Sequence, residues 1–215
     1  MTTEQSAPQP TGAPDRVARD WDGAYQKAET PWDTAMPSPH LVAFCESQRL
    51  AGRALEIGCG YGHNAIWLAR QGISVVATDV SQTALERADQ LARQAGLGSP
   101  PVFRAHDVLS GPLPDEEPFD FVFDRGVFHI HRSAEERQRF AQVVHDSLKP
   151  DGLWLTIAGN ADEPSPAGMG PPTLSASELI QAIEPHFRLL QLSTIRMLIA
   201  GGHTPRAWRL VAARR

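Results

Sequence analysis

The sequence predicts an α/β protein with a mostly parallel sheet that carries helices on both faces. From residue 53 onward, short apolar runs typical of buried strands alternate with segments of helical periodicity. Helix starts are marked by serine caps at Ser81, Ser133 and Ser175, and the last two are followed by glutamate in the capping-box pattern. A chain of 215 residues with 41% hydrophobic content can bury the core of one domain.

Seven strands are expected. The first five lie in a stretch where strand signals alternate with helix signals, which is the order of a parallel sheet. The last two are separated by an apolar loop with two glycines, at 195–203, which would line a pocket. The expected strands are 53–57, 74–78, 102–105, 119–123, 153–157, 187–193 and 207–213.

Helices are expected between these strands. The segment 64–70 opens directly after the first strand, and the helix capped by Ser81 should stop at Gly96. The helix that begins after Ser133 places Phe140 and its apolar neighbours on one inward face. Residues 149–152, Lys-Pro-Asp-Gly, read as a tight turn before the fifth strand.

The chain ends and one loop have their own composition. Residues 1–15 are rich in Thr, Gln, Pro and Ser, so they bury too little surface to offset ordering entropy, and we expect a disordered tail. Residues 16–215 form the domain. Within it, 160–174 is a long Pro- and Gly-rich loop at the end of the sheet where ligands enter, and we expect it to face the substrate.

Composition excludes several partners. The net charge of -5 offers no basic stripe for nucleic acid, and a small neutral, anionic or polarizable substrate fits better. Cys45 and Cys59 are too few for a zinc site and an improbable disulfide, so we expect no metal and a cytoplasmic protein. No apolar run is long enough to span a bilayer, which predicts no membrane partner.

The most informative stretch is 54–62, Ala-Leu-Glu-Ile-Gly-Cys-Gly-Tyr-Gly. Gly58 and Gly60 follow an apolar strand and let the backbone turn close to a ligand. Asn64 opens a helix whose first N–H groups face the same ligand. Asp79 comes about 20 positions after Gly58, where a carboxylate at the tip of the next strand accepts both ribose hydroxyls. The pattern indicates an adenosine-type ligand.

Two residues separate the possible adenosine ligands. A dinucleotide fingerprint needs glycine or alanine where this chain has His63, which disfavours a nicotinamide oxidoreductase. Glu56, before the first glycine, suits a ligand that carries a sulfonium and an ammonium. The chain here resembles the class I S-adenosylmethionine-dependent methyltransferases. That resemblance implies a single-domain, seven-stranded Rossmann-like sheet with an antiparallel last strand beside the fifth, and S-adenosyl-L-methionine as cofactor with S-adenosyl-L-homocysteine as product.

The flanking motifs narrow the resemblance. Trp21-Asp-x-x-Tyr25 and Thr30-Pro-Trp-Asp33 precede the first strand, the segment 123–129 follows the fourth strand, and 170–172 lies in the long loop before the next helix. These resemble the thiopurine and thiol methyltransferases and their plant relatives that act on halide and thiocyanate. The resemblance implies that 16–50 forms N-terminal helices and a lid, with Trp32 closing over the cofactor. Trp21 is equally consistent with a mere anchor for its helix.

The resemblance also implies the cofactor contacts. Asp107 would accept the adenine amino group and the Val108 N–H would meet a ring nitrogen, although Asp107 also fits a local turn cap. The expected cofactor-binding residues are Trp21, Trp32, Glu56, Gly58, Cys59, Gly60, Asn64, Asp79, Val80, Asp107, Val108, Asp124 and Arg125.

The expected catalytic residues are Arg125, His129 and His131, on the loop after the fourth strand that should face the methyl group. A cation there would raise the thiolate fraction of a thiol, and a histidine would serve as general base. Arg125 also fits the methionine carboxylate or a pair with Asp124. His129 also fits a satisfied loop histidine, and His131 a lead into the next helix.

We therefore expect methyl transfer to a small molecule, with a thiol as first choice. The alternatives are O-methylation of a phenol or quinol, methylation of halide, tellurite or selenium species, and a non-catalytic protein that only binds S-adenosylmethionine. The expected partner is the small-molecule substrate alone, in a monomer or weak homodimer.

Overall fold

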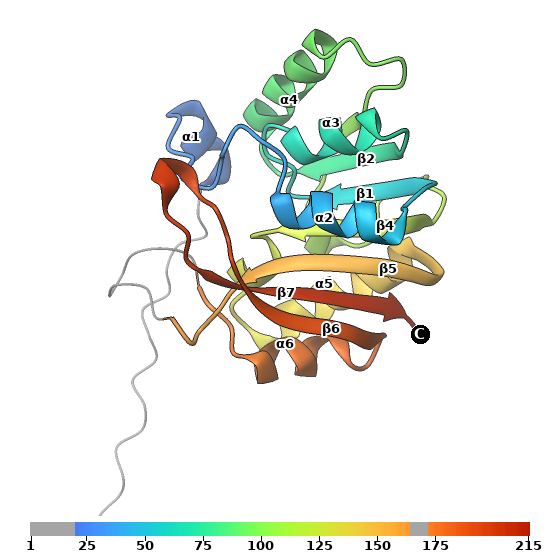
Figure 1. The fold of residues 1–215 in the computed structure, drawn as a ribbon, viewed down its shortest axis with the longest axis vertical. Helices are drawn as coiled ribbons and strands as arrows, with labels where there is room; N and C mark the ends of the chain where they lie inside the picture. Colours follow the sequence, from blue (N-terminus) through green and yellow to red (C-terminus); the bar gives the residue numbers. More distant parts are fainter. Residues whose placement is uncertain (1–19, 164–171) are drawn as a thin grey trace, which may run out of the picture.

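One seven-stranded sheet organises the molecule. The computed structural model describes residues 20–163 and 172–215, and its strands follow the order β3-β2-β1-β4-β5-β7-β6 (Figure 1). The expected tail and part of the Pro- and Gly-rich loop, including Met169 to Pro171, lie outside the described residues. The strands are β1 (Arg53–Ile57), β2 (Ser74–Asp79), β3 (Val102–Ala105), β4 (Phe119–Arg125), β5 (Leu148–Gly159), β6 (Phe187–Arg196) and β7 (Arg206–Arg214).

Strand directions follow the expectation. β1 to β5 pair in parallel, so their carboxyl ends meet at one edge of the sheet. β7 pairs antiparallel with β5 and with β6, and it lies between them. The antiparallel last strand beside the fifth is therefore confirmed, and ligand-binding side chains are to be sought at the shared carboxyl edge.

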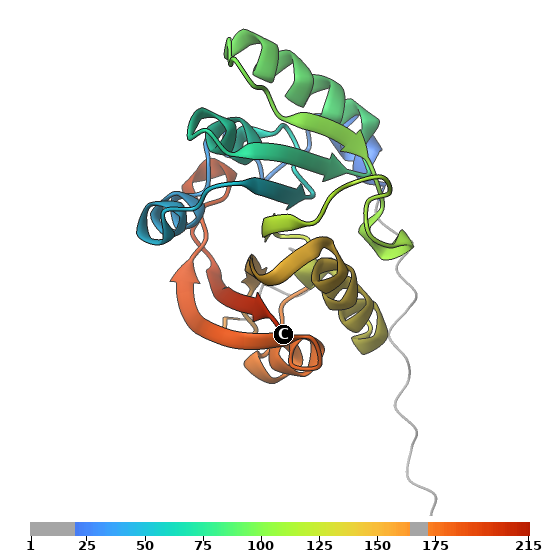
Figure 2. The same ribbon diagram turned by 90° about the vertical axis from the view of Figure 1, so that its right-hand side faces the viewer.

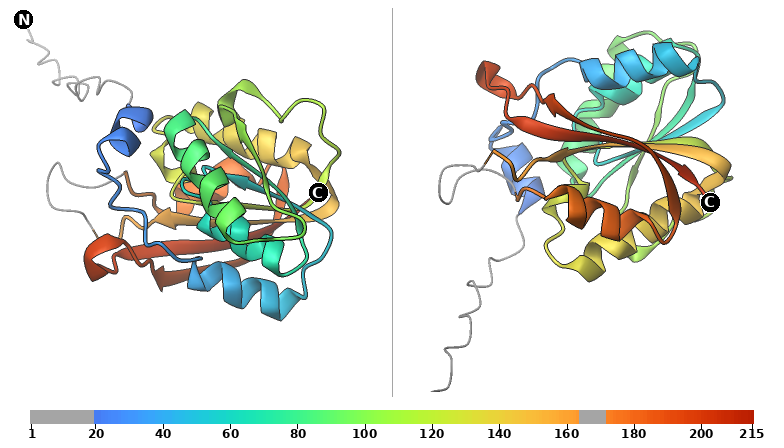
Figure 3. Two further views of the ribbon diagram at one scale, coloured as in Figure 1. Left: turned by 90° about the horizontal axis from the view of Figure 1, so that it is seen from above. Right: turned by 60° about the horizontal axis from the view of Figure 1, so that its bottom comes forward.

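Helices cover both faces of this sheet (Figure 2 and Figure 3). Leu41, Ala65 and Leu85, from three different helices, pack in one core cluster with Phe121 of β4. Phe140 and Leu179 pack in the other cluster, on the opposite face. The helices are α1 (Trp21–Gln26), α2 (Pro39–Gln48), α3 (His63–Arg70), α4 (Gln82–Gln94), α5 (Ala134–Ser147) and α6 (Ala176–Ile183), with short 3₁₀ turns η1 (Val108–Ser110), η2 (Phe128–Ile130) and η3 (Ala200–Gly202).

The serine caps start the helices where the sequence places them. The Ser81 hydroxyl accepts a hydrogen bond from the Ala84 N–H, and complete capping boxes open α5 and α6 at Ser133 and Ser175. Each cap satisfies N–H groups that have no partner within the helix. These three helix starts are fixed by local sequence.

The predicted turn at 149–152 is part of β5 instead of preceding it. β4 pairs Phe119 with Leu148 and Phe121 with Leu153, so four residues of β5 bulge opposite one residue of β4. The Lys149 ammonium donates to both carboxylate oxygens of Asp120, at 2.8 and 2.9 Å, and holds the bulge against β4. β5 consequently begins five residues before its expected start.

The β6–β7 hairpin reaches past the sheet edge. Its tip lies at the same end of the sheet as α1 (Figure 1), and the Ala200 N–H donates to the Pro31 carbonyl at 2.8 Å. Two segments far apart in sequence therefore meet beside the carboxyl ends of the strands. Within the described part of the chain, no helix has the length and apolarity needed to cross a membrane.

Candidate functional site

The turn after β1 leaves bare backbone at the carboxyl edge. Gly58 and Gly60 have φ values of 67° and 53°, which favour glycine. A Cβ on Gly58 would lie 2.2 Å from Val127 Cγ2, and one on Gly60 would lie 2.7 Å from the Tyr25 hydroxyl. The Cys59 N–H donates to the Thr78 carbonyl at 2.9 Å and ties the turn to β2. Cys59 itself is buried, and burial raises the pKa of its thiol, so the thiol stays uncharged within the turn.

Asp79 ends β2 directly beside this turn. Its Oδ2 accepts the Gly60 N–H at 2.9 Å, and its Oδ1 accepts the Ser81 N–H at 3.0 Å. Burial raises the pKa of this carboxyl, although the two backbone donors oppose that rise. Each carboxylate oxygen retains acceptor capacity for a further donor. Val80, the next residue, is an apolar side chain that is 53% exposed at the rim.

Glu56 lies within β1, on the face covered by α2 and α3. Its Oε1 accepts the Asn64 side-chain N–H at 2.8 Å, while Asn64 Oδ1 accepts the Ser38 N–H at 2.8 Å. Its Oε2 is buried and finds no donor among the described residues. Burial raises the pKa of Glu56 to about 8. The arrangement suits a ligand that brings a cationic N–H donor to Oε2.

Asp107 follows β3 and caps η1. Its Oδ1 accepts the Leu109 N–H at 3.0 Å, so the local-cap reading of this residue holds. The side chain is exposed, and the backbone of Val108 follows it at the same edge. The His106 N–H donates to the Asp79 carbonyl at 3.0 Å and places Asp107 next to the end of β2. A cap and an adenine contact are compatible at this position.

An aromatic cluster from the N-terminal segment covers the glycine turn. The Trp32 Nε1–H donates to the Tyr25 hydroxyl at 2.9 Å, and the Trp32 ring meets Trp21 edge-on with centroids 5.4 Å apart. Tyr25 also contacts Tyr61 of the turn, at 5.1 Å between centroids. Neither tyrosine was among the expected site residues. For Tyr25 the sequence did contain a signal, because Trp21 and Tyr25 are four residues apart and therefore share one face of α1.

Asp22 fastens α1 to the start of α4. Its Oδ1 accepts the Ser81 hydroxyl at 2.6 Å and the Thr83 N–H at 2.9 Å. Sequence reasoning missed this contact, because an exposed aspartate in a first helical turn looks like an ordinary cap. The N-terminal segment is thereby attached to the helix that follows Asp79.

Arg125 ends β4 and joins two covering segments. Its Nη1 donates to the Trp32 carbonyl at 3.0 Å, and its Nη2 donates to the Leu198 carbonyl of the β6–β7 hairpin. Burial lowers the pKa of the guanidinium, while Glu56 and Asp33 favour its charged form. The expected pair with Asp124 is absent from the described contacts. The geometry makes Arg125 a bridge between the Trp32 segment and the hairpin.

The structure corrects the expected role of Asp124. This side chain is fully buried on the face covered by α5 and α6, opposite to Glu56. Its Oδ1 accepts the Phe128 N–H at 3.0 Å and its Oδ2 accepts the Trp154 Nε1–H at 2.9 Å. Burial raises its pKa to about 6. Both oxygens serve the core and the start of η2, so we assign Asp124 to stability instead of cofactor binding.

The two expected histidines lie in and after η2. His129 is buried, and its Nδ1 accepts a hydrogen bond from the Gly159 N–H at the carboxyl end of β5. Burial, with smaller effects of His131 and Arg125, lowers its pKa to about 4. His131 packs against Phe140 with centroids 5.3 Å apart, and its carbonyl accepts a donor from Arg137. The contacts of His131 fit its role as a lead into α5.

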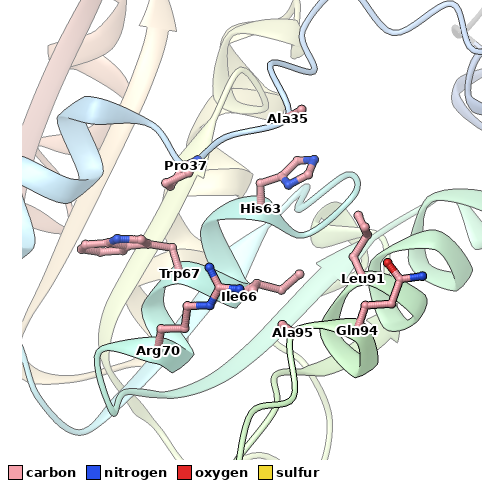
Figure 4. Close-up of a pocket in the computed structure, with 9 residues that line it drawn as sticks. All are labelled: Ala35, Pro37, His63, Ile66, Trp67, Arg70, Leu91, Gln94 and Ala95. Atoms are coloured by element: carbon pink, nitrogen blue, oxygen red, sulfur yellow. The ribbon is translucent and has the colours of Figure 1, made fainter.

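A surface hollow of about 290 Å³ lies between α3 and α4 (Figure 4). His63, which lines the hollow, also contacts the N-terminal segment, because its Nε2 lies 3.4 Å from Asp33 Oδ1. None of Glu56, Asp79 or the first two turn glycines lines it, so it is separate from the site described above. In residues 20–163 and 172–215, no cluster of three His, Cys, Asp or Glu side chains could hold a metal ion.

Comparisons with known proteins identify a family of methyltransferases. A family model described as Thiopurine S-methyltransferase matches residues 16–202. Thiocyanate methyltransferase 1 of Brassica oleracea is 33% identical over 138 residues, which are 64% of this chain and 60% of that protein. Probable thiol methyltransferase 2 of Arabidopsis thaliana is 31% identical over 166 residues, or 77% of this chain and 71% of the relative. The match therefore spans less than two thirds of the first of these relatives.

A solved structure has the same fold over most of the chain. It is described as "Conversion of a Disulfide Bond into a Thioacetal Group during Echinomycin Biosynthesis", and it superposes with a TM-score of 0.78 at 25% identity. The superposition covers 90% of this chain and 90% of that chain, so the shared fold extends beyond the central sheet.

Proposed function

The chain belongs to the thiopurine S-methyltransferase family, and from this premise we propose that it transfers a methyl group from S-adenosyl-L-methionine to a small-molecule acceptor, most readily a thiol. The single observation that carries the proposal is the unpartnered, buried Oε2 of Glu56 beside the glycine turn. An acceptor of that kind fits the ammonium of the cofactor's methionine part.

The residues present fit this cofactor. Glu56 would hold the ammonium, Asp79 would hold the ribose hydroxyls, and the backbone of the Gly58–Gly60 turn would lie against the nucleoside. Asp107 and Val108 would meet the adenine, with Val80 packed against it. Trp21, Trp32 and Asn64 would close and support the methionine side. When bound, the cofactor supplies a methyl group on a sulfonium sulfur.

The protein's own task is then to exclude water and to orient two ligands. The Tyr25–Trp32 pair and the Arg125 bridge would close over the glycine turn, so that residues 16–50 act as a lid together with the hairpin tip. The loop 160–174 would complete the acceptor side, although only its ends are described. Alignment of reacting atoms supplies roughly 7–11 kcal/mol in well-oriented reactions.

A thiol is the preferred acceptor for a chemical reason. A thiol has a reference pKa of about 8.5 and is partly ionised at neutral pH, whereas a phenol near 10 needs a base. The acceptor side offers an N–H donor from His129, and Asp124 does not supply a carboxylate base there because its side chain is fully buried in the core with Trp154. Relatives named for thiols and thiocyanate support the same choice.

Two measurements test the proposal. Calorimetry should show that S-adenosyl-L-homocysteine binds, and incubation with labelled S-adenosylmethionine should label an aromatic thiol faster than the matching phenol. A heat-denatured sample and a thiol-free sample serve as controls. Binding without transfer to any thiol, phenol, thiocyanate or halide would identify a non-catalytic binding protein, and absence of binding would overturn the cofactor assignment.

The same proposal includes the compartment, the partners and the oligomeric state of the protein. The net charge of -5 and the free, buried Cys45 and Cys59 support a cytoplasmic protein that acts on a small molecule without nucleic acid, membrane or metal. We assign it as a monomer or weak homodimer. Light scattering behind size exclusion, across a hundredfold range of concentration, measures that state directly.

A further inference from the structure

The ring of His129 is held in one tautomer by the backbone. The Gly159 N–H donates to His129 Nδ1, so this nitrogen must be an unprotonated acceptor. A neutral imidazole with a bare Nδ1 carries its proton on Nε2. The other ring nitrogen is therefore an N–H donor and has no lone pair with which to remove a proton.

The ring of His129 lies at the carboxyl edge of the sheet, between the ends of β4 and β5. His129 follows β4, two residues after Val127, whose Cγ2 occupies the space next to Gly58. Nε2 lies 4.0 Å from where a Cβ of Gly126 would stand, and a Cβ on Gly159 would lie 3.2 Å from Nδ1. Glycine at both positions leaves the ring room between the ends of β4 and β5. Among the described residues, the ring's only hydrogen bond is the one that Nδ1 accepts from Gly159.

The charged and titratable groups around the ring keep it neutral. On its own loop these are His131 and Arg125, and both disfavour a protonated ring. β1 contributes Glu56, which couples to Arg125, and β4 contributes Asp124, whose oxygens are used in the core. β5 contributes only the Gly159 backbone N–H at this ring. Burial and these neighbours hold the pKa of His129 at about 4, so the ring is neutral above pH 5.

We propose that His129 is a fixed Nε2–H donor that binds the nucleophilic atom of an acceptor that arrives already ionised. This inference rests on the proposed methyl transfer and names its substrate class: small anions and readily ionised thiols, not neutral phenols. The acceptor leaves its proton in water before it binds. Its lone pair then forms the bond to the methyl carbon, the electrons of the old bond stay on the cofactor sulfur as it becomes a neutral thioether, and no proton passes to the protein.

A matched pair of variants separates the donor from the acceptor function of the ring. His129→Asn keeps an oxygen near the Nδ1 position for the Gly159 N–H and removes the Nε2 donor, whereas His129→Gln returns an N–H near the Nε2 position. With thiocyanate and with an acidic aromatic thiol, we expect His129→Asn to lower kcat/KM by about tenfold to a hundredfold, the effect of a hydrogen bond to a charged group. His129→Gln should recover at least half of that loss on a logarithmic scale. Affinity for S-adenosyl-L-homocysteine should change by less than about threefold in both.

The pH profile is the readout that a structural role would leave unchanged. Rates are measured at saturating S-adenosylmethionine from pH 5.5 to 9, so that titration of free Glu56 does not enter. With thiocyanate, an anion throughout, kcat/KM for the acceptor should be flat; with a series of thiols it should follow each thiol's own pKa. A histidine-like limb with thiocyanate that disappears in His129→Asn would overturn the proposal, as would full activity of His129→Asn. Absence of transfer to every acceptor would instead remove the proposed function on which it rests.

Discussion

The two halves of the carboxyl edge present opposite groups to a ligand. At the ends of β1 and β2, the structure places the buried carboxyls of Glu56 and Asp79, whose pKa values are both raised by burial. At the ends of β4 and β5 it places Arg125, whose guanidinium donates to the carbonyls of Trp32 and Leu198, and the neutral ring of His129, whose Nδ1 accepts the Gly159 N–H. Under the proposed function, the first half would accept hydrogen bonds from the cofactor's ammonium and ribose, and the Nε2–H of His129 would donate to an anionic acceptor.

Strand alternation explains this separation. Glu56 lies on the face of β1 toward α2 and α3, where Asn64 reaches it, whereas Asp124 lies on the other face of neighbouring β4 with Trp154. A third carboxylate near the reacting atoms would repel an anionic acceptor. The fold avoids this by directing Asp124 into the core.

The largest effect is expected from Asp79→Ala, which removes the acceptor of the Gly60 N–H and the proposed acceptor of two ribose hydroxyls. Hydrogen bonds to a charged group contribute roughly 1.5–3 kcal/mol each, so affinity for S-adenosyl-L-homocysteine should fall by at least about a hundredfold. Titration calorimetry measures it, with the melting temperature of the apo protein as control. An affinity within about threefold of the parent would show that Asp79 is not the ribose anchor.

Glu56→Gln tests the carboxyl half of the edge through the proton that cofactor binding should release. The pKa of Glu56 in the free protein is about 8, above that of an ordinary carboxyl, so the group is mostly protonated at pH 7. Binding of an ammonium requires the carboxylate and should release a proton, so that affinity rises with pH, by up to about tenfold per unit, until about pH 8. Calorimetry in phosphate and Tris, which differ in ionisation enthalpy, should detect this release.

The glutamine variant is the matched control. It should bind S-adenosyl-L-homocysteine about tenfold to a hundredfold more weakly, with no proton release. In the apo protein, stability should change with pH in the opposite direction to cofactor affinity. Because the pKa of Glu56 is raised, its contribution to stability is full below about pH 4.5 and is lost as pH rises through about 8. Melting curves at pH 5 and 8.5 should show a smaller pH dependence in Glu56→Gln. Equal proton release in both proteins would assign the linkage to another group.

A smaller effect is expected at the lid. Trp32→Ala removes the donor to Tyr25 and the contact with Trp21, and cofactor affinity should fall by about fivefold to twentyfold while the apo melting temperature stays nearly constant. Tyr25→Phe, which keeps the ring and loses only the acceptor, should cost about twofold to fivefold. A loss of apo stability near 3–5 kcal/mol, typical of a deleted core aromatic, would make Trp32 a core residue.

Asp107→Ala should have the smallest effect, because the side chain is exposed and its Oδ1 caps η1. Loss of a cap costs about 0.5–2 kcal/mol of local stability, and we expect cofactor affinity to fall by less than about twofold. Asp107→Asn keeps the cap and changes the second oxygen, so it isolates an adenine contact. An affinity of Asp107→Asn equal to that of the parent would indicate that the adenine is held by the Val108 backbone alone.

Local signals made much of this molecule predictable. The bounds of β1 and β3 agree with the expected ranges, and Ser81, Ser133 and Ser175 begin their helices, because strand runs and caps are encoded by neighbouring residues. The glycine turn and Asp79 were likewise expected together, since consecutive parallel strands end at one edge. The start of β5 was missed because the bulge depends on pairing with Asp120, far away in the chain.

By itself, the sequence determined the class of sheet, the pairing of the glycine turn with Asp79 and the family, because these depend on short-range spacing and on strand order. Only the tertiary structure decided the acceptor half. Asp124 points into the core because Trp154 offers it a donor there, Arg125 is used by carbonyls of Trp32 and Leu198, and His129 is fixed as a donor by the backbone of Gly159. Each role depends on a partner distant in sequence, and the protonation state of a buried side chain follows from the groups that surround it.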